Sequence, residues 1–318
     1  MTAVWVLGSR GLLGSALSTT LLHDGVDVFA PQEPFSWRDE SHLQSQVQAA
    51  VRAFSSEAQE AGGWEIYWAA GVGTMGSPEE VLTAETRAMT LFLEFFKSDA
   101  SLMAVPGAIV FSSSAGAIYA ASPEEIITEK TAVAPNNPYA YTKLKQEELL
   151  RVFAMECKNV SVLVARISTL YGVGQATGKS QGLLTNIARN IVRNRPTQIY
   201  VPLDTIRDYI SAPDAAATIV GTLRMPERRE KYLIKIIASE RPTSIAEIVS
   251  IFKQISRRHP RITTSASRLS KLYSRRVQFR SVVPRGSATP TPESLIVGIA
   301  HLLSAERLAH SSPPSVSV

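Results

Sequence analysis

The sequence predicts an α/β fold, with a doubly wound parallel sheet and a smaller C-terminal lobe. Short apolar runs alternate with segments of helical apolar spacing through the first half of the chain. A glycine turn, Gly8 to Gly14, follows the first apolar run directly, and the regular alternation fades after Tyr171. Strands that alternate with helices of this length pair in parallel and carry helices on both faces of the sheet.

The apolar runs predict buried strands in the first half of the chain, at residues 4–7, 26–30, 66–70, 108–111 and 160–165. Helical spacing predicts the helices between them, at residues 12–22, 40–60, 79–96 and 139–156. Beyond Tyr171 we expect four more helices, at residues 183–193, 214–223, 243–256 and 293–303. We also expect two strands, at residues 199–201 and 232–237, and a loop at residues 284–292. The predicted domains are residues 1–171, completed by parts of 208–240, and a substrate-facing lobe of 172–207 and 241–309. The Ser/Pro-rich residues 310–318 are expected to be a disordered tail.

The composition excludes several classes of protein. The chain has 318 residues, a net charge of +5 and a single cysteine, Cys157, which is expected to be a small core residue. No disulfide framework, signal peptide or membrane-spanning run is predicted, so we expect a cytoplasmic protein. Many arginines follow position 189, which allows a nucleic-acid partner. A solvated surface, with a few arginines facing an anionic small molecule, is the interpretation that we favour.

The glycine turn has the spacing Gly-x-x-Gly-x-x-Gly, with glycines at 8, 11 and 14. Glycine lets the backbone approach a pyrophosphate, and the N-terminus of the following helix directs free N–H groups towards it. We therefore predict that Gly8, Arg10, Gly11, Leu12 and Gly14 bind a dinucleotide. The alternative is a tight turn that any α/β protein could contain.

The second strand is not followed by a clear acid that would bind an adenine ribose, since Pro31-Gln32-Glu33 comes next. Arg10 could instead neutralise a 2′-phosphate, so both NAD and NADP are expected cofactors, with NAD favoured. Asp39 could contact the adenine side, and the turn Ala69-Ala70-Gly71 the nicotinamide side. The alternatives are a helix cap for Asp39 and a simple strand-end turn for Ala69 to Gly71.

Tyr139 and Lys143 stand four residues apart at a helix start, so they share one face of the helix and can reach the same ligand. A nearby ammonium group and a cationic nicotinamide both favour the phenolate, which makes tyrosine a usable acid or base. Tyr141 and Lys145 repeat the spacing, but two residues along a helix turn the side chain by about 200°, so one site cannot use both pairs. Pro138 at the helix entry favours Tyr139, and an amphipathic surface pair suits Tyr141 and Lys145.

Three serines, Ser112 to Ser114, end the fourth predicted strand. In a parallel sheet this places them at the carboxyl edge, where ligands bind. We expect Ser112 to contact the cofactor and Ser114 to hydrogen-bond a substrate oxygen beside the tyrosine. Ser113 is the second choice for a substrate contact, because side chains alternate along a strand. A polar strand end without a function is the alternative.

At these residues the chain resembles the extended short-chain dehydrogenase/reductase family of nucleotide-sugar epimerases, dehydratases and reductases. The resemblance covers about two thirds of the chain, from Val4 to Asp214. Its motifs are the glycine turn, Phe111-Ser112-Ser113-Ser114-Ala115 with Tyr119, Pro138-Tyr139 with Thr142-Lys143, Arg166 with Leu170-Tyr171-Gly172, and Arg207-Asp208-Tyr209-Ile210. It implies a Rossmann domain that binds a dinucleotide and a lobe that binds substrate.

The resemblance implies a transient oxidation of a sugar hydroxyl group. Tyr139 would take the hydroxyl proton, Ser114 would steady the keto oxygen, and Lys143 would hold the nicotinamide ribose and lower the pKa of the tyrosine. Arg207 would bind the diphosphate of the nucleotide-sugar, and Tyr119 would also contact the substrate. The alternative for Arg207 is a structural salt bridge with Asp208. No metal site is predicted, and family resemblance implies a homodimer formed through helices 79–96 and 139–156.

Departures from the family pattern narrow the reaction. Sugar 4,6-dehydratases of the family follow the catalytic hydroxyl with an acidic pair, whereas Ala115-Gly116-Ala117 follows Ser114 here. Glu85 stands where the family often carries asparagine, and Arg280 is a possible second phosphate contact. We therefore predict an NAD(P)-dependent nucleotide-sugar epimerase. A sugar reductase is the alternative enzyme, and a dinucleotide-binding sensor without turnover is the alternative of another class.

Overall fold

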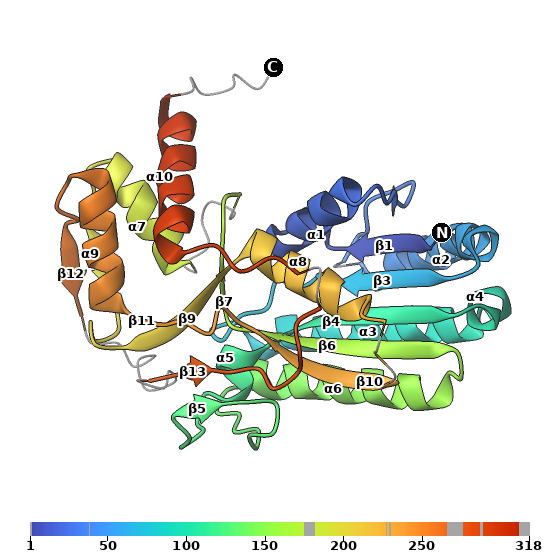
Figure 1. Ribbon diagram of the computed structural model, residues 1–318. Coiled ribbons are helices and arrows are strands. Elements are labelled where there is room, and N and C mark those ends of the chain that lie inside the picture. The colour runs from blue at the N-terminus through green and yellow to red at the C-terminus, as the bar shows by residue number, and fades with distance from the viewer. Residues whose placement is uncertain are drawn as a thin grey trace.

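The computed structural model describes residues 2–37, 39–174, 182–226, 228, 230–265, 276–286 and 289–311. Its centre is a six-stranded sheet with the order β10-β6-β4-β3-β1-β2, in which every neighbouring pair is parallel (Figure 1). The strands are β1 Ala3–Leu7, β2 Val28–Phe29, β3 Trp64–Trp68, β4 Gly107–Ser114, β6 Val160–Ile167 and β10 Tyr232–Ile237. The predicted fold class is therefore confirmed.

Helices cover both faces of this sheet. Helices α1 (Leu12–His23) and α8 (Ala212–Leu223) pack on one face, and their buried side chains share a core with β1, β4 and β6. Helices α2 (Glu40–Ala61), α3 (Glu79–Ser98) and α6 (Pro138–Glu156) pack on the other, around an aromatic core. Asn137 caps α6 by accepting a hydrogen bond from Ala140 N at 3.0 Å, and Pro138 occupies the first turn. The helix thus starts one residue before the predicted 139.

In its described residues, the C-terminal lobe is built from short strands and the helices α7, α9 and α10. A three-stranded sheet has the order β11-β9-β7, and two further two-stranded sheets pair β12 with β8 and β13 with β5. Its helices α7, α9 and α10 enclose a separate core, with Tyr171 and Tyr209 of the small sheet (Figure 1). The bounds are β5 Ile126–Ile127, β7 Thr169–Tyr171, β8 Thr197–Ile199, β9 Ile206–Ser211, β11 Pro242–Ser244, β12 Ile262–Thr264, β13 Gln278–Phe279, α7 Leu183–Val192, α9 Ile245–Ser256 and α10 Leu295–Ser311, with the short helices α4 Ala100–Ala104 and α5 Ala115–Ile118 elsewhere.

Some predicted boundaries were wrong. The third strand covers Trp64–Trp68 and not 66–70. The acidic Glu65 is unusual in a buried strand, but it forms an ion pair with Arg224 at 2.8 Å. The last helix extends to Ser311, beyond the predicted end at 303, and Glu306 in the extension pairs with Arg189 of α7 at 3.1 Å. His310 and Ser311 are therefore helical and not part of a disordered tail, and residues 312–318 lie outside the described residues.

Two features of the composition have structural counterparts. Cys157 is 7% exposed and is a core residue, as predicted. Within the described residues, no helix has the length and hydropathy to cross a membrane.

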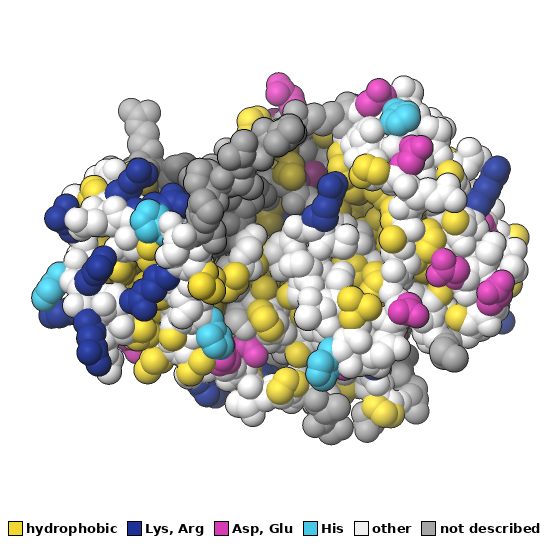
Figure 2. Space-filling view, turned by 90° about the horizontal axis from the view of Figure 1, so that it is seen from above, with side chains coloured by type: hydrophobic (Ala, Val, Ile, Leu, Met, Phe, Trp, Pro, Cys, Tyr) yellow, Lys and Arg dark blue, Asp and Glu magenta, His cyan; other side chains and the backbone are white. Residues whose placement is uncertain are grey.

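Figure 2 shows Lys and Arg side chains gathered on the side of the molecule that carries the lobe. The exposed arginines there include Arg193, Arg195, Arg257, Arg258 and Arg261.

A buried lysine and a carboxylate attach the segment 276–286 to the main sheet. Lys235 of β10 is 1% exposed, and its Nζ donates to Val283 O at 2.6 Å and Pro284 O at 3.2 Å. Glu129 accepts from Ile236 N and from Val282 N, each at 2.8 Å. Lys235 and Glu129 therefore help to hold this segment against the sheet. Burial lowers the pKa of Lys235 to about 8.

This lysine predicts a pH dependence of stability. Its pKa is lower in the folded protein (about 8) than the ordinary 10.5, so above pH 8 the unfolded chain binds more protons. We compare the free energy of unfolding of the wild type with that of Lys235→Met. The wild-type value minus the variant value should increase as the pH rises from about 8 to 10.5. Denaturant unfolding of both proteins across this pH range measures the difference. A difference that stays constant or decreases with pH would refute this role of Lys235.

Candidate active site

The glycine turn lies between β1 and α1, at the carboxyl edge of the main sheet. Gly8 has φ +86°, and a Cβ atom there would lie 2.6 Å from Ala70 N. A Cβ atom on Gly14 would lie 2.0 Å from Gly8 O, so both positions require glycine. Gly11 is the N-cap of α1, and no side chain caps the helix. The turn is therefore a backbone cradle with an open helix N-terminus, which suits a pyrophosphate.

Gly14→Ala should disrupt this cradle, since the added methyl group would collide with the Gly8 carbonyl oxygen. We expect a loss of about 2 kcal/mol or more in the free energy of unfolding, together with loss of dinucleotide binding. Thermal unfolding and NADH fluorescence measure the two effects. Gly116→Ala is the matched control, because no atom lies within 4 Å of a Cβ atom there. Equal behaviour of the two variants would contradict the assigned role of Gly14.

The other residues predicted to contact the cofactor lie in three places: the turn after β3, the tip of the glycine turn and the start of α2. Ala69 and Ala70 lie against the glycine turn, with Ala69 N donating to Leu7 O at 2.9 Å, and Gly71 follows with φ +150°. Arg10 is exposed at the tip of the turn. Asp39 is the N-cap of α2 and accepts from His42 N at 3.1 Å, which lowers the pKa of its carboxyl group. Its cap function is thus observed, whereas its contact with an adenine ribose stays a prediction.

The structure brings Ser114, Tyr139 and Lys143 together at the same edge of the sheet. Ser114 ends β4, and its hydroxyl group accepts from Ala117 N at 3.3 Å and lowers the pKa of the Tyr139 phenol. Lys143 of α6 is buried, with Nζ 4.8 Å from the centre of the Phe111 ring and 5.7 Å from that of Tyr139. It also donates to Ser112 O at 3.4 Å. A strand end and a helix face therefore supply one cluster of proton-carrying groups.

Exposure distinguishes between the two overlapping Tyr-x-x-x-Lys pairs. Tyr141 is 59% exposed and Lys145 is also exposed, so this pair lies on the surface of α6. Tyr139 is only partly exposed and Lys143 is 6% exposed, beside the serines of β4. The geometry therefore favours the first pair, as the helical rotation between them requires.

The surroundings keep Tyr139 protonated in the protein alone. Burial raises the pKa of its phenol well above the ordinary value, and the negative charge of Glu85 raises it further, while the hydrogen bond with Ser114 lowers it. Burial lowers the pKa of Lys143, and Glu85 and Glu147 oppose that shift. A cationic ligand in this site would therefore be needed to make the phenolate accessible.

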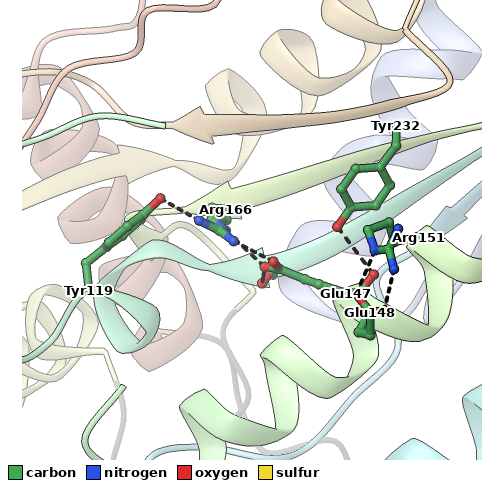
Figure 3. A network of polar contacts seen from close by, with 7 residues as sticks. Tyr119, Glu147, Glu148, Arg151, Arg166 and Tyr232 are labelled. Atoms are coloured by element: carbon green, nitrogen blue, oxygen red, sulfur yellow. Dashed lines mark hydrogen bonds and ion pairs between the residues drawn. The ribbon is translucent and has the colours of Figure 1, made fainter. Parts of the chain in front are cut away.

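Two residues predicted to contact substrate are buried behind the site instead. Ser113 is 5% exposed and donates to Glu147 Oε1 at 2.6 Å, and Tyr119 is 1% exposed and accepts from Arg166 Nη1. Arg166 and Glu147 form the centre of this network, with a distance of 2.6 Å from Nη2 to Oε2 (Figure 3). Ser112 and Ser114 remain partly exposed, as strand alternation requires. Ser113 and Tyr119 therefore take part in a buried network, and their contact with a substrate stays a prediction.

Arg166 is a charged group that the chain buries fully. Although burial lowers the pKa of its guanidinium group, the ion pair with Glu147 raises it above the ordinary value. Glu147 lies four residues after Lys143, so one face of α6 carries both the site lysine and the partner of Arg166. That spacing is a sequence signal which could have identified the network.

Arg207 lies on β9, where the lobe meets the main sheet. Its Nη1 donates to Ile206 O at 2.9 Å. The neighbouring Asp208 is 1% exposed and accepts from Ser168 Oγ at 2.7 Å and from Ser239 N at 2.9 Å. Asp208 therefore links β9 to the residues that follow β6 and β10, which sets the lobe against the sheet edge. Arg280 follows β13, with its N–H bonded to Ile127 O at 2.9 Å.

Sequence reasoning missed Glu85 as a site residue. Its carboxylate accepts hydrogen bonds from Val72 N and Gly73 N, in the turn that follows β3. The only signal in the sequence was a glutamate at a position where the family described above often has asparagine. Among the described residues, no group of three or more His, Cys, Asp or Glu side chains is placed to hold a metal ion.

A parallel sheet with a glycine cradle after β1 and a Ser-Tyr-Lys cluster after β4 defines a protein of the Rossmann type. The model of the NAD dependent epimerase/dehydratase family matches residues 4–236. The chain belongs to this family.

Individual relatives share shorter stretches with this chain. The dTDP-4-dehydro-6-deoxyglucose reductase of Escherichia coli is 31% identical over 115 residues, 36% of each chain. The dTDP-L-rhamnose 4-epimerase of Burkholderia thailandensis is 30% identical over 125 residues, 39% of this chain and 33% of its own. The chain thus spans about a third of the length of these curated relatives. The solved structure of MoeE5 in complex with UDP-glucose and NAD has a TM-score of 0.77 at 22% identity, covering 97% of this chain and 100% of that one.

Proposed function

We propose that this protein is an NAD(P)-dependent nucleotide-sugar epimerase that acts by transient oxidation of a sugar hydroxyl group. The observation that carries the proposal is the meeting of Ser114, Tyr139 and Lys143 at the sheet edge that also holds the glycine cradle. One set of groups can hold a dinucleotide and the other can move a proton beside it. The relatives named above include both an epimerase and a reductase of dTDP-sugars.

The glycine turn suits a nicotinamide dinucleotide, because its close backbone packing exists only without side chains at Gly8 and Gly14. The turn Ala69 to Gly71 would border the nicotinamide, and Lys143 would hold its ribose. The chemistry that such a bound group supplies is reversible acceptance of a hydride from a sugar carbon. NAD is the cofactor that we favour, while the exposed Arg10 would admit the extra phosphate of NADP.

Three side chains of this chain would handle the proton and the sugar oxygen. Ser114 would hydrogen-bond the reacting oxygen, and Tyr139 would take its proton when the sugar is oxidised and return it when the keto group is reduced. Lys143 would stabilise the phenolate form of Tyr139, together with the positive charge of a bound oxidised nicotinamide. The position of Ser114 at the end of β4, where it acts on the pKa of Tyr139, supports these roles.

The lobe would bind the substrate, and Arg207 is the residue that we assign to its diphosphate. A guanidinium group binds phosphate in a bidentate manner, and β9 places Arg207 where the lobe meets the sheet. We assign the basic surface of the lobe to solvent and not to nucleic acid. A dehydratase is not favoured, because Ala115-Gly116-Ala117 form α5 and supply no carboxylate for loss of water.

A groove between α3 and α6 supports a homodimer. It is lined by residues of both helices, including Arg87, Glu94, Tyr141 and Lys145, with a volume of about 760 Å³. Both signs of charge and the exposed Tyr141 suit a second copy of the same surface. Sedimentation of the wild type and of Tyr141→Glu tests this, with a monomeric wild type as the contradicting result. The buried Cys157 is the only cysteine, and we place the protein in the cytoplasm.

Mass spectrometry of the purified protein separates the epimerase from the reductase. An epimerase retains its dinucleotide through purification and consumes none, so we expect a tightly bound dinucleotide close to one per chain. Ready release of the dinucleotide, with stoichiometric consumption of NADPH by a keto-sugar, would establish the reductase instead.

A further inference from the structure

The carboxylate of Glu85 is fixed in the turn that follows β3. Glu85 projects from α3, and its Oε1 accepts from Val72 N and from Gly73 N, each at 2.5 Å. Two successive backbone N–H groups directed at one oxygen form an anion-binding turn. Hydrogen bonds from both N–H groups fix the position of this carboxylate. This site therefore holds a negative charge in a defined place.

The two glycines of the turn leave room for this carboxylate. A Cβ atom on Gly73 would lie 3.1 Å from Glu85 Oε1 and 2.7 Å from Leu82 Cδ2. A Cβ atom on Gly71 would lie 3.4 Å from Glu85 Oε2, and its φ of +150° also favours glycine. The turn and the acid therefore fit each other, and the sequence Gly71-Val72-Gly73 is explained by the presence of Glu85.

The turn stands between the two halves of the proposed site. It leaves β3, which pairs with β1 on one side and with β4 on the other. Residues 69–71 contact the glycine turn after β1, and Ser112 to Ser114 end the neighbouring β4. A charge at residues 71–73 is thus at the edge where the nicotinamide end of a dinucleotide would meet Tyr139.

The other charged groups around Tyr139 come from two elements. Helix α6 contributes Lys143 and Glu147, and β6 contributes Arg166, while β4 and α5 contribute no charged residue. Glu147 is already paired with Arg166. Glu85 is the largest of the charge effects on Tyr139 and on Lys143, and it raises the pKa of both groups. Its charge therefore acts on the site, in addition to holding the turn.

We propose that Glu85 is a positioning residue whose fixed charge makes this site bind the oxidised, cationic nicotinamide in preference to the neutral reduced form. This inference rests on the proposed function, because it takes the dinucleotide to bind at this edge. Such a preference keeps the oxidised form in the site between turnovers, which is the form that accepts the hydride from the sugar. Tyr139 would stay protonated until the cationic ring arrives beside it.

The test compares the two redox forms of the cofactor, whose phosphates and riboses are the same. Wild type, Glu85→Gln, Glu85→Asp and Glu80→Gln are equilibrated with an equimolar mixture of NAD⁺ and NADH, or of NADP⁺ and NADPH. The ratio of bound oxidised to bound reduced form is then measured by mass spectrometry after gel filtration. Glutamine retains the acceptor oxygen for both N–H groups but lacks the charge. Glu80 is an exposed acid on the same helix and serves as the control.

We expect Glu85→Gln to lower this ratio about tenfold, as loss of one nearby charge predicts, and Glu80→Gln to leave it unchanged. Glu85→Asp should restore most of the wild-type ratio. An unchanged ratio in Glu85→Gln, with or without weaker binding of both forms, would show that the acid only holds the turn and would overturn the inference. Absence of dinucleotide binding in the wild type would instead refute the proposed function on which it rests.

Discussion

Tyr139→Phe is expected to lower turnover by about a hundredfold to ten-thousandfold, the range that general acid or base catalysis contributes. The substitution removes only the phenol hydroxyl group, so the fold and the glycine cradle should be unchanged. Dinucleotide binding should therefore persist at close to the wild-type affinity. Product formation and NADH fluorescence, measured on the same preparation, separate the two effects.

Tyr141→Phe is the matched control for this variant, because Tyr141 belongs to the second Tyr-x-x-x-Lys pair and is 59% exposed. It should retain turnover. If Tyr139→Phe turned over at the wild-type rate, Tyr139 would have no role in the mechanism. A wild type without any turnover, but with normal dinucleotide binding, would favour the sensor over the enzyme.

Glu147→Gln is expected to lower the free energy of unfolding by about 3–5 kcal/mol, because it leaves the buried guanidinium charge of Arg166 without its partner. The side chains of Arg166 and Glu147 are 5% and 4% exposed, and Arg166 also donates to Tyr119 (Figure 3). Ser113 completes the network by donating to Glu147. Denaturant unfolding monitored by tryptophan fluorescence measures the loss. Dinucleotide binding to the folded fraction should remain, since the network lies behind the site.

Glu148→Gln is the control for this prediction. Glu148 is the next residue on α6 and pairs with Arg151, but both side chains are about half exposed, at 57% and 47%. Water solvates these charges, so the loss of the pair should have little effect on stability. Similar losses in Glu147→Gln and Glu148→Gln would show that burial does not govern the contribution of the Arg166 network.

The catalytic candidates could be predicted because local rules place them. The end of a parallel strand lies at the ligand-binding edge, and residues four apart share a helix face, so Ser114, Tyr139 and Lys143 followed from the sequence. The glycine spacing likewise predicted the cradle, since an added Cβ atom collides with backbone there. The main sheet followed from the alternation of apolar runs and helices.

The residues that were missed, or whose surroundings the sequence did not show, depend on contacts between distant segments. Ser113 and Tyr119 face Glu147 and Arg166, and nothing in the serine run itself indicates which hydroxyl group points into the core. Glu85 acts through a turn 12 residues earlier in the chain. Apart from β9, the described strands of the lobe have only two or three residues, too short for an apolar pattern to show.

The central claim is that the Ser114, Tyr139 and Lys143 cluster carries out transient oxidation of a nucleotide-sugar. The most direct measurement incubates the purified protein with a panel of UDP- and dTDP-hexoses while following both sugar isomers by chromatography and the absorbance of reduced nicotinamide. We predict that one nucleotide-sugar is converted to a new isomer without net change in that absorbance, and that Tyr139→Phe abolishes the conversion. Net consumption of reduced cofactor in step with product, or isomer formation by Tyr139→Phe at the wild-type rate, would contradict the claim.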